Sequence, residues 1–305
     1  MALGTIVGLL NRCEEPVDLE LDIPDPQIVL LSNFFPDELV KVQLSRTQSI
    51  LSSEDYMPIE GATVRLLVGD ESVEQLQEVE ASDGNPPFYT TTVFKPRVGV
   101  RYTLHASAPG YDPISAVSSI PEPVPISLFR QTSLQVIDLA DGETEVKLGF
   151  ELDYEDPDAA ITYYHLRLIQ EVEELHVIPT IGDTVVVGQR LEPIIFPASS
   201  TNGIWIPALS RSGGGILLID KPFSPLLNLN LTNSFKDLER PGRLFAELRV
   251  VSEDYYNFQS SLSKKRLTSG LPSNGQGGEI QNNVTNGQGV FAGYNSVLDT
   301  LDVAF

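Results

Sequence analysis

Four acidic side chains lie close together in "DYEDPDAA" and could bind a metal ion: Asp153, Glu155, Asp156 and Asp158. Calcium prefers several oxygen ligands at about 2.4 Å, and carboxylates crowded at the end of a strand can supply them. The spacing is not that of an EF-hand loop, because the glycine and the distal glutamate of that loop are absent. The cluster therefore predicts either a calcium site or a solvated turn shaped by Pro157 and Asp158.

A second candidate is the glycine pattern in "NGQGVFAGY", where Gly287, Gly289 and Gly293 are spaced as G-x-G-x-x-x-G. A dinucleotide-binding loop needs a hydrophobic parallel strand before its glycines and an amphipathic helix after them. The preceding "SNGQGGEIQNNVT" is polar, and the following "YNSVLDTLDVAF" is typical of a terminal strand. We therefore expect a bulge or a close backbone approach, with Val290, Phe291 and Tyr294 anchoring the tail to a sandwich.

The other residue types with chemical potential give no catalytic pattern. His105, His165 and His176 form no close pair, so we expect solvated or hydrogen-bonded sheet residues in place of metal ligands. The chain has no Gly-x-Ser-x-Gly elbow, and its single cysteine has no catalytic context. We expect a protein that is not an enzyme and that uses no organic cofactor.

The charge balance excludes one class of partner. The chain has 20 basic and 42 acidic residues, a formal net charge of −22, so it repels phosphate backbones and we expect no nucleic-acid binding. Hydrophobic residues make up 41% of the 305 residues, which is enough for real cores and about two domains.

Cys13 follows the short apolar run "LGTIVGLLNR", which is too short for a membrane-spanning helix and has the length of a signal-peptide core. The stretch resembles the bacterial lipoprotein box, although Arg12 stands where that box has a small residue. Cys13 is therefore predicted to carry a lipid after signal cleavage. The alternative is an ordinary N-terminal strand with a free thiol. The acidic "EEP" after Cys13 resembles the surface-export signal of Bacteroidota lipoproteins.

Period-two alternation recurs along the chain and predicts strands with one buried and one solvated face. It is clear in four stretches: "ATVRLLV", "VRYTLHASA", "TEVKLGFEL" and "RLFAELRVV". No strand–helix–strand alternation is present, so we expect an all-β fold of two tandem antiparallel β-sandwiches. One short C-terminal helix is predicted in "SEDYYNFQSSLSKKR", with Ser252 as its cap and Tyr255, Phe258 and Leu262 on one face.

The prolines of "IPEPVPI" mark the best boundary, because they favour a stiff, extended connector. We expect a lipoprotein signal and tether over 1–17, a first sandwich over 18–120, a linker over 121–126 and a second sandwich over 127–305. Residues 171–241 make the second unit longer than a minimal sandwich. They are expected to form extra strands and long loops, and the only tryptophan, Trp205, is a candidate for ligand or partner contact there.

Several stretches resemble known families. "PIEGATVRLLVGD" and "PFYTTTVFKPRVGVRYTLHASAPGY" resemble a transthyretin-like or carboxypeptidase-regulatory-like sandwich, and "LGFELDYEDPDAAITYYHLRL" resembles a fibronectin-type or immunoglobulin-like module. With "AELRVVSEDYYNFQSSL" and the closing "NNVTNGQGVFAGYN", the ordered set resembles a Bacteroidota outer-membrane lipoprotein family known only as a domain of unknown function. That resemblance implies a gene beside one for a TonB-dependent receptor, and it supplies no catalytic residue.

The sequence thus leads to one main expectation and two alternatives. The main one is a lipid-anchored, surface-exposed outer-membrane binding protein, an accessory to a TonB-dependent receptor that works without catalysis. The first alternative is a calcium-dependent adhesion or structural module of the cell envelope, motivated by the cluster from Asp153 to Asp158. The second is a hydrolase acting on carbohydrate or peptide, for which the extracellular setting is the only support.

Overall fold

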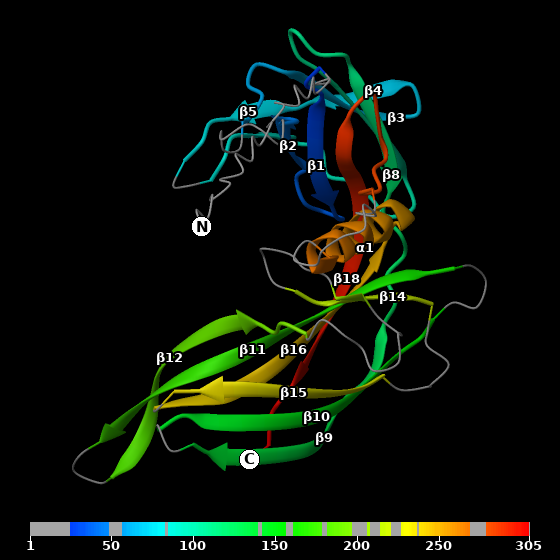
Figure 1. Cartoon of the computed structure of the whole chain (residues 1–305). Coiled ribbons are helices and arrows are strands. Elements are labelled where there is room, and N and C mark those ends of the chain that lie inside the picture. The colour runs from blue at the N-terminus through cyan, green and yellow to red at the C-terminus, as the bar shows by residue number, and fades with distance from the viewer. Residues whose placement is uncertain are drawn as a thin grey trace, which may run out of the picture.

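The structure is a computed structural model of the 305-residue chain. It describes residues 25–48, 57–82, 85–139, 142–156, 161–178, 182–196, 206–207, 214–220, 227–236, 238–268 and 279–304. The fold is all-β with one helix, as predicted, and its strands form two lobes with the helix between them (Figure 1).

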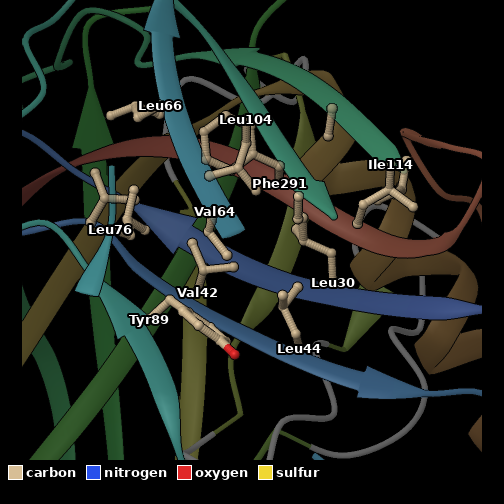
Figure 2. Packing of buried hydrophobic residues seen from close by; sticks show 14 of the residues in the cluster. Leu30, Val42, Leu44, Val64, Leu66, Leu76, Tyr89, Leu104, Ile114 and Phe291 are labelled. Carbon is tan, nitrogen blue, oxygen red and sulfur yellow. The ribbon is translucent and has the colours of Figure 1, made fainter. Parts of the chain in front are cut away.

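The first lobe is a sandwich of two layers. One layer has the strand order β17 (Val284–Thr285), β8 (Ile114–Ser119), β7 (Arg101–Ser107), β3 (Thr63–Val68) and β4 (Glu71–Gln75). The other contains β1 (Ile28–Phe34), β2 (Lys41–Arg46), β6 (Phe88–Thr90) and β5 (Gln77–Val79). Side chains from both layers meet in one core, which includes Leu30, Val42, Leu66, Leu104 and Phe291 (Figure 2).

The second lobe is also a sandwich. Its smaller layer is β15 (Leu227–Phe235), β10 (Thr144–Tyr154) and β9 (Ile126–Asp138). The facing layer contains β13 (Ile206–Pro207), β14 (Ile216–Ile219), β11 (Tyr163–Ile178) and β16 (Glu239–Val251), and β12 (Asp183–Pro193) pairs with the outer half of β11. The layers share a core of aliphatic and aromatic side chains that includes Phe150, Leu152, Tyr164, Leu168 and Leu248.

The last strand, β18 (Gln288–Leu301), belongs to both sandwiches. Its first half pairs with β1, from Val29 opposite Gln288 to Phe34 opposite Gly293. Its second half pairs with β16, from Val251 opposite Tyr294 to Leu244 opposite Leu301. One sheet therefore runs without a break through both lobes (Figure 1). The β1–β18 pairing is parallel, whereas every other strand pairing among the described residues is antiparallel.

The C-terminal residues thus contribute to the first sandwich as well as to the second. Sequence reasoning grouped them with the second unit, 127–305, whereas Val284 and Phe291 are buried in the core of the first lobe. The proline connector leads from Ile120, buried in the first core, to Val124, buried in the second. The connector and β18 thus both join the two lobes, and between them the chain returns from β16 of the second lobe, through α1, to β17 of the first.

The alternation in the four predicted strand stretches is confirmed. Their buried side chains fall at every second position: Val64 and Leu66; Tyr102, Leu104 and Ala106; Val146, Leu148, Phe150 and Leu152; Leu244, Ala246, Leu248 and Val250. His105, between two of these, is exposed as expected.

The predicted helix is confirmed as α1 (Glu253–Thr268), and it crosses the outer face of β18 (Figure 1). Ser252 is its N-cap, because its hydroxyl accepts a hydrogen bond from the Tyr255 amide at 3.3 Å. Glu253 and Asp254 lie in the first turn, and Lys265 and Arg266 in the last, so both ends complement the helix dipole.

Candidate functional site

The main candidate site is a groove of about 780 Å³ between α1 and the outer face of the first sandwich, which we call the α1 groove. Its floor is formed by residues of four strands: Leu31, Ser32 and Asn33 of β1, Lys41 and Gln43 of β2, Phe88 of β6 and Val290 of β18. Its wall is one side of α1, with Phe258, Gln259, Leu262 and Arg266. The described residues of its far rim are Ser82, Asn85 and Pro86.

Strand alternation explains the floor. In β1, Leu30 and Phe34 point into the first core, so Leu31 and Asn33 between them point out of the sandwich. In β2, Val42 and Leu44 are buried, so Lys41 and Gln43 face the same outer surface. The register pairs Leu31 with Gln43, which places these outward side chains side by side.

The wall has a different origin. The buried residues Tyr255, Tyr256, Ser260 and Ser263 mark the side of α1 that packs on the protein. Phe258 packs against the buried cluster that contains Tyr255, in line with the predicted shared face. Phe258 and Leu262 are half-buried and also line the groove.

Among the described residues that line the α1 groove two are charged, and both are cationic. The Lys41 ammonium lies 5.6 Å from the centre of the Phe88 ring, within the range of a cation–π contact. Arg266 supplies the second positive charge, in the last turn of α1. Among the described residues that line the groove none is acidic, although acidic residues outnumber basic ones by 42 to 20 in the chain.

A buried polar contact fixes α1 in place. His165 of β11 is 3% exposed, and its Nδ1 lies 2.9 Å from the hydroxyl of Tyr255 on the helix. Its Nε2 has no hydrogen-bond partner among the described residues. A Cβ at Gly215 would lie 2.5 Å from that atom, so the imidazole needs glycine at this position of the neighbouring segment.

The surroundings of His165 favour its neutral form. Burial is the main reason that its pKa is well below the usual value of a histidine, and the charges of Arg249 and Arg167 act in the same direction. Burial also raises the pKa of the Tyr255 hydroxyl, although Arg249 partly opposes this shift. The pair is therefore uncharged at neutral pH, which suits a structural contact beneath the helix.

Tyr294 of β18 connects the helix and the two sandwiches. The Arg249 guanidinium lies 4.5 Å above its ring, and Arg249 is in turn paired with Glu247 at 2.7 Å. The rings of Phe35 and Tyr255 have centroids 5.1 Å and 6.1 Å from that of Tyr294. Side chains from the first lobe, the second lobe and α1 thus meet on one residue, and the groove wall is held rigidly.

Val290, Phe291 and Tyr294 are all buried, as the sequence predicted for the anchors of the tail.

The predicted acidic cluster is only partly described. The Tyr164 hydroxyl donates a hydrogen bond to Asp156, and one Asp153 oxygen accepts the Tyr154 amide at 3.0 Å. Asp158 lies outside the described residues. Within the part of the chain that the structure describes, no group of three or more His, Cys, Asp or Glu side chains is arranged to hold a metal ion. The calcium site stays a prediction.

Two other predicted positions, Cys13 and Trp205, also lie outside the described residues. No helix formed by the described residues is both long enough and apolar enough to cross a membrane. The structure adds the α1 groove, which sequence reasoning did not identify. The alternation in "KVQL" does place Lys41 and Gln43 on an outer face, but no sequence signal indicates that α1 borders this face.

Comparison with known proteins gives a family and no activity. A search of the curated proteins found no match. Among solved structures the chain is similar to one described as "Three N-terminal domains of the bacteriophage RB49 Highly Immunogenic Outer Capsid protein (Hoc)", with 9% sequence identity and a TM-score of 0.21. The match covers 75% of this chain and 64% of that one, and a TM-score this low does not indicate a shared fold. Residues 14–298 match the family described as "Domain of unknown function (DUF4249)", and the chain belongs to this family.

Proposed function

We propose that this chain is a non-catalytic binding protein of the bacterial cell envelope. In this proposal Cys13 carries the lipid that anchors it to the outer membrane, the protein faces the cell surface, and it works as an accessory to a TonB-dependent receptor. The observation that carries the binding role is the α1 groove, whose volume of about 780 Å³ is in the range of small-molecule sites.

The chemistry of the groove supports binding over catalysis. Its described lining offers hydroxyl, carboxamide, cationic and aromatic groups, which orient a ligand and hold it. A general acid or base needs a carboxylate, imidazole or thiol near the reacting atom, and the described lining contains none of these. His165, the buried imidazole closest to α1, is engaged with Tyr255 beneath the helix.

Metabolic labelling tests the anchor. The protein is expressed from its own gene in cells supplied with radiolabelled palmitate, beside a Cys13→Ser variant as the matched control. We expect the label in the wild-type protein, which should fractionate with membranes, and no label in the variant. An unlabelled wild-type protein in the soluble fraction would contradict the anchor.

A further inference from the structure

We propose that a hollow on the outer face of the first sandwich binds a tetrahedral oxyanion, the phosphate or sulfate group of a small ester or the free anion. This β3–β7 hollow has a volume of about 420 Å³. It is lined by Thr63 and Arg65 of β3, by His105, Ala106 and Ser107 of β7, and by the start of β8. All these residues lie within the described segments 57–82 and 85–139. The hollow and the α1 groove belong to different layers, so the inference goes beyond the proposed function.

Strand register brings four polar side chains together in the hollow. The alternate residues of β3 and β7 are buried in the first core, so the side chains between them point out of the sandwich. The antiparallel pairing places Arg65 opposite His105 and Thr63 opposite Ser107. Opposite residues have Cβ atoms about 5 Å apart, and successive outward positions on one strand are about 7 Å apart. The four side chains thus form a compact group that one small ligand can contact.

These four side chains can all donate hydrogen bonds. The Arg65 guanidinium has five N–H groups in a planar fork, which can hold two oxygens of one anion. The His105 imidazole supplies a further N–H group, and the hydroxyls of Thr63 and Ser107 supply two O–H groups. A phosphate or sulfate ester presents three terminal oxygens to these donors, whereas a carboxylate presents only two. The group therefore matches a tetrahedral oxyanion best.

Arg65 and His105 are available to an external partner. Both side chains are exposed, and neither has an ion pair or a hydrogen bond with any described residue. Arg240 of the second lobe differs, because it pairs with Glu173 at 2.7 Å. The chain has 42 acidic and 20 basic residues, so most cations can find a carboxylate within the fold. An arginine that has none among the described residues, and that lies beside a histidine, favours an anion from outside.

The charge of the whole chain does not prevent binding of an anion here. The net charge of −22 repels anions at long range, but at physiological ionic strength charges more than about 8 Å away are largely screened. Asp112 directly precedes the lining residue Pro113, but no acidic residue is among the described lining residues. The hollow is also larger than a single phosphate, and its volume is in the range of small-molecule sites. It therefore has room for the body of an ester as well as for its anionic group.

Calorimetric titration of the purified full chain in a phosphate-free buffer tests the proposal with glucose 6-phosphate, inorganic phosphate and glucose. We expect both phosphates to bind and glucose, which has no anionic group, not to bind. Tighter binding of glucose 6-phosphate would identify an ester as the ligand, and equal or weaker binding would identify the free anion. Arg65→Gln should weaken both phosphates about tenfold. Arg65→Lys, which keeps the charge without the planar fork, and His105→Ala should each weaken them about threefold.

Arg101→Gln is the matched control, because it removes the same charge from the same face of β7. Arg101 is exposed, lies four positions from His105, about 13 Å along the strand, and does not line the hollow. Its loss should change either affinity by less than about twofold. All substituted side chains are exposed, and an unchanged melting temperature confirms that each variant is folded.

Three results would overturn the proposal: no binding of either phosphate, equal binding of glucose and glucose 6-phosphate, or equal weakening by Arg101→Gln and Arg65→Gln. The last result would show that the charge of the whole face, and not the β3–β7 hollow, attracts the anion. The titrations involve neither the α1 groove nor a membrane or receptor. Failure here therefore leaves the proposed function to its own tests.

Discussion

The carbonyl oxygen of Leu30 occupies the space that a side chain at Gly289 would need. The two residues are register partners in the parallel pairing of β1 with β18, and Gly289 has φ of +113°, a conformation that other residues rarely adopt. A Cβ at Gly293 would likewise overlap the Ser119 carbonyl, and one at Gly287 would lie 2.7 Å from the Ile28 carbonyl oxygen. The glycines that resemble a nucleotide loop therefore let this segment approach the backbones of β1 and of the end of β8.

Replacement of Gly289 by alanine should be among the most damaging single changes in the first lobe. The new Cβ overlaps backbone atoms of Leu30, which cannot move without separating β1 from β18. We expect a loss of more than about 3 kcal/mol in the free energy of unfolding, measured by urea denaturation.

Gly110→Ala separates the two causes of that loss, which are the clash of the new Cβ with the Leu30 backbone and the strain of a positive φ. Gly110 also has a positive φ, +84°, but a Cβ there would meet nothing within 4 Å. It should lose only about 1–2 kcal/mol, the cost of the backbone conformation alone. Equal losses at the two positions would contradict the close approach of β18 to β1.

Asn283 should be needed to hold the start of β18. Its side-chain nitrogen donates to the Phe291 carbonyl at 2.8 Å, and its oxygen accepts the Phe291 amide at 3.0 Å. Asn283→Ala leaves both backbone groups without this partner, and we expect a loss of about 1–3 kcal/mol in a denaturant titration. Asn283→Asp should be at least as damaging at neutral pH, because it turns a carboxylate oxygen toward the carbonyl and adds a charge near Asp254.

The same asparagine-to-aspartate change at the neighbouring Asn282 is the control. Asn282 is exposed, and its oxygen accepts the Val284 amide at 2.9 Å, a role that aspartate keeps. Its stability should change by no more than about 0.5 kcal/mol. A similar loss at both positions would show that added charge in this segment, and not the contact with Phe291, is responsible.

His165 should make the stability of the protein depend on pH. Its pKa is depressed in the folded state because of burial, so the unfolded chain binds more protons at this site. The stabilising contribution is therefore complete above the ordinary histidine value of about 6.5 and is lost as the pH falls below it. Between about pH 7 and pH 5, wild-type protein should lose up to about 1.4 kcal/mol per pH unit more than His165→Asn.

His105→Asn, at an exposed position on β7, should reproduce the wild-type pH profile. Urea midpoints across this pH range measure the difference, because shared carboxylate effects cancel between variants. Parallel profiles for wild type and His165→Asn would show that the buried imidazole is not the source of the pH dependence.

The local sequence pattern was sufficient to predict the strands and the helix. The period-two burial of Tyr102, Leu104 and Ala106, and the cap at Ser252, depend on residues adjacent in the sequence. Burial of Phe291 and Tyr294 was also predictable, because aromatic residues in a polar, glycine-rich tail need a core to pack in. These features follow from residue type and spacing alone.

The shared strand and the α1 groove could not be obtained in this way. The pairing of Leu30 with Gly289 joins the two ends of the chain, and no periodicity in either segment specifies which strand the other will meet. Lys41 and Phe258 likewise belong to one site only because β18 places α1 beside β1 and β2. His165 was expected to be a solvated or hydrogen-bonded sheet residue; it contacts the Tyr255 hydroxyl, and both α1 and the segment at Gly215 pack against its buried ring.

Affinity purification of the tagged, full-length protein from native outer membranes tests the proposed function most directly. We expect a TonB-dependent receptor to be recovered in a stoichiometric amount with the wild-type protein and to be lost with the Cys13→Ser variant, which should not reach the membrane. Recovery of the membrane-anchored chain without a receptor would contradict the proposed accessory role.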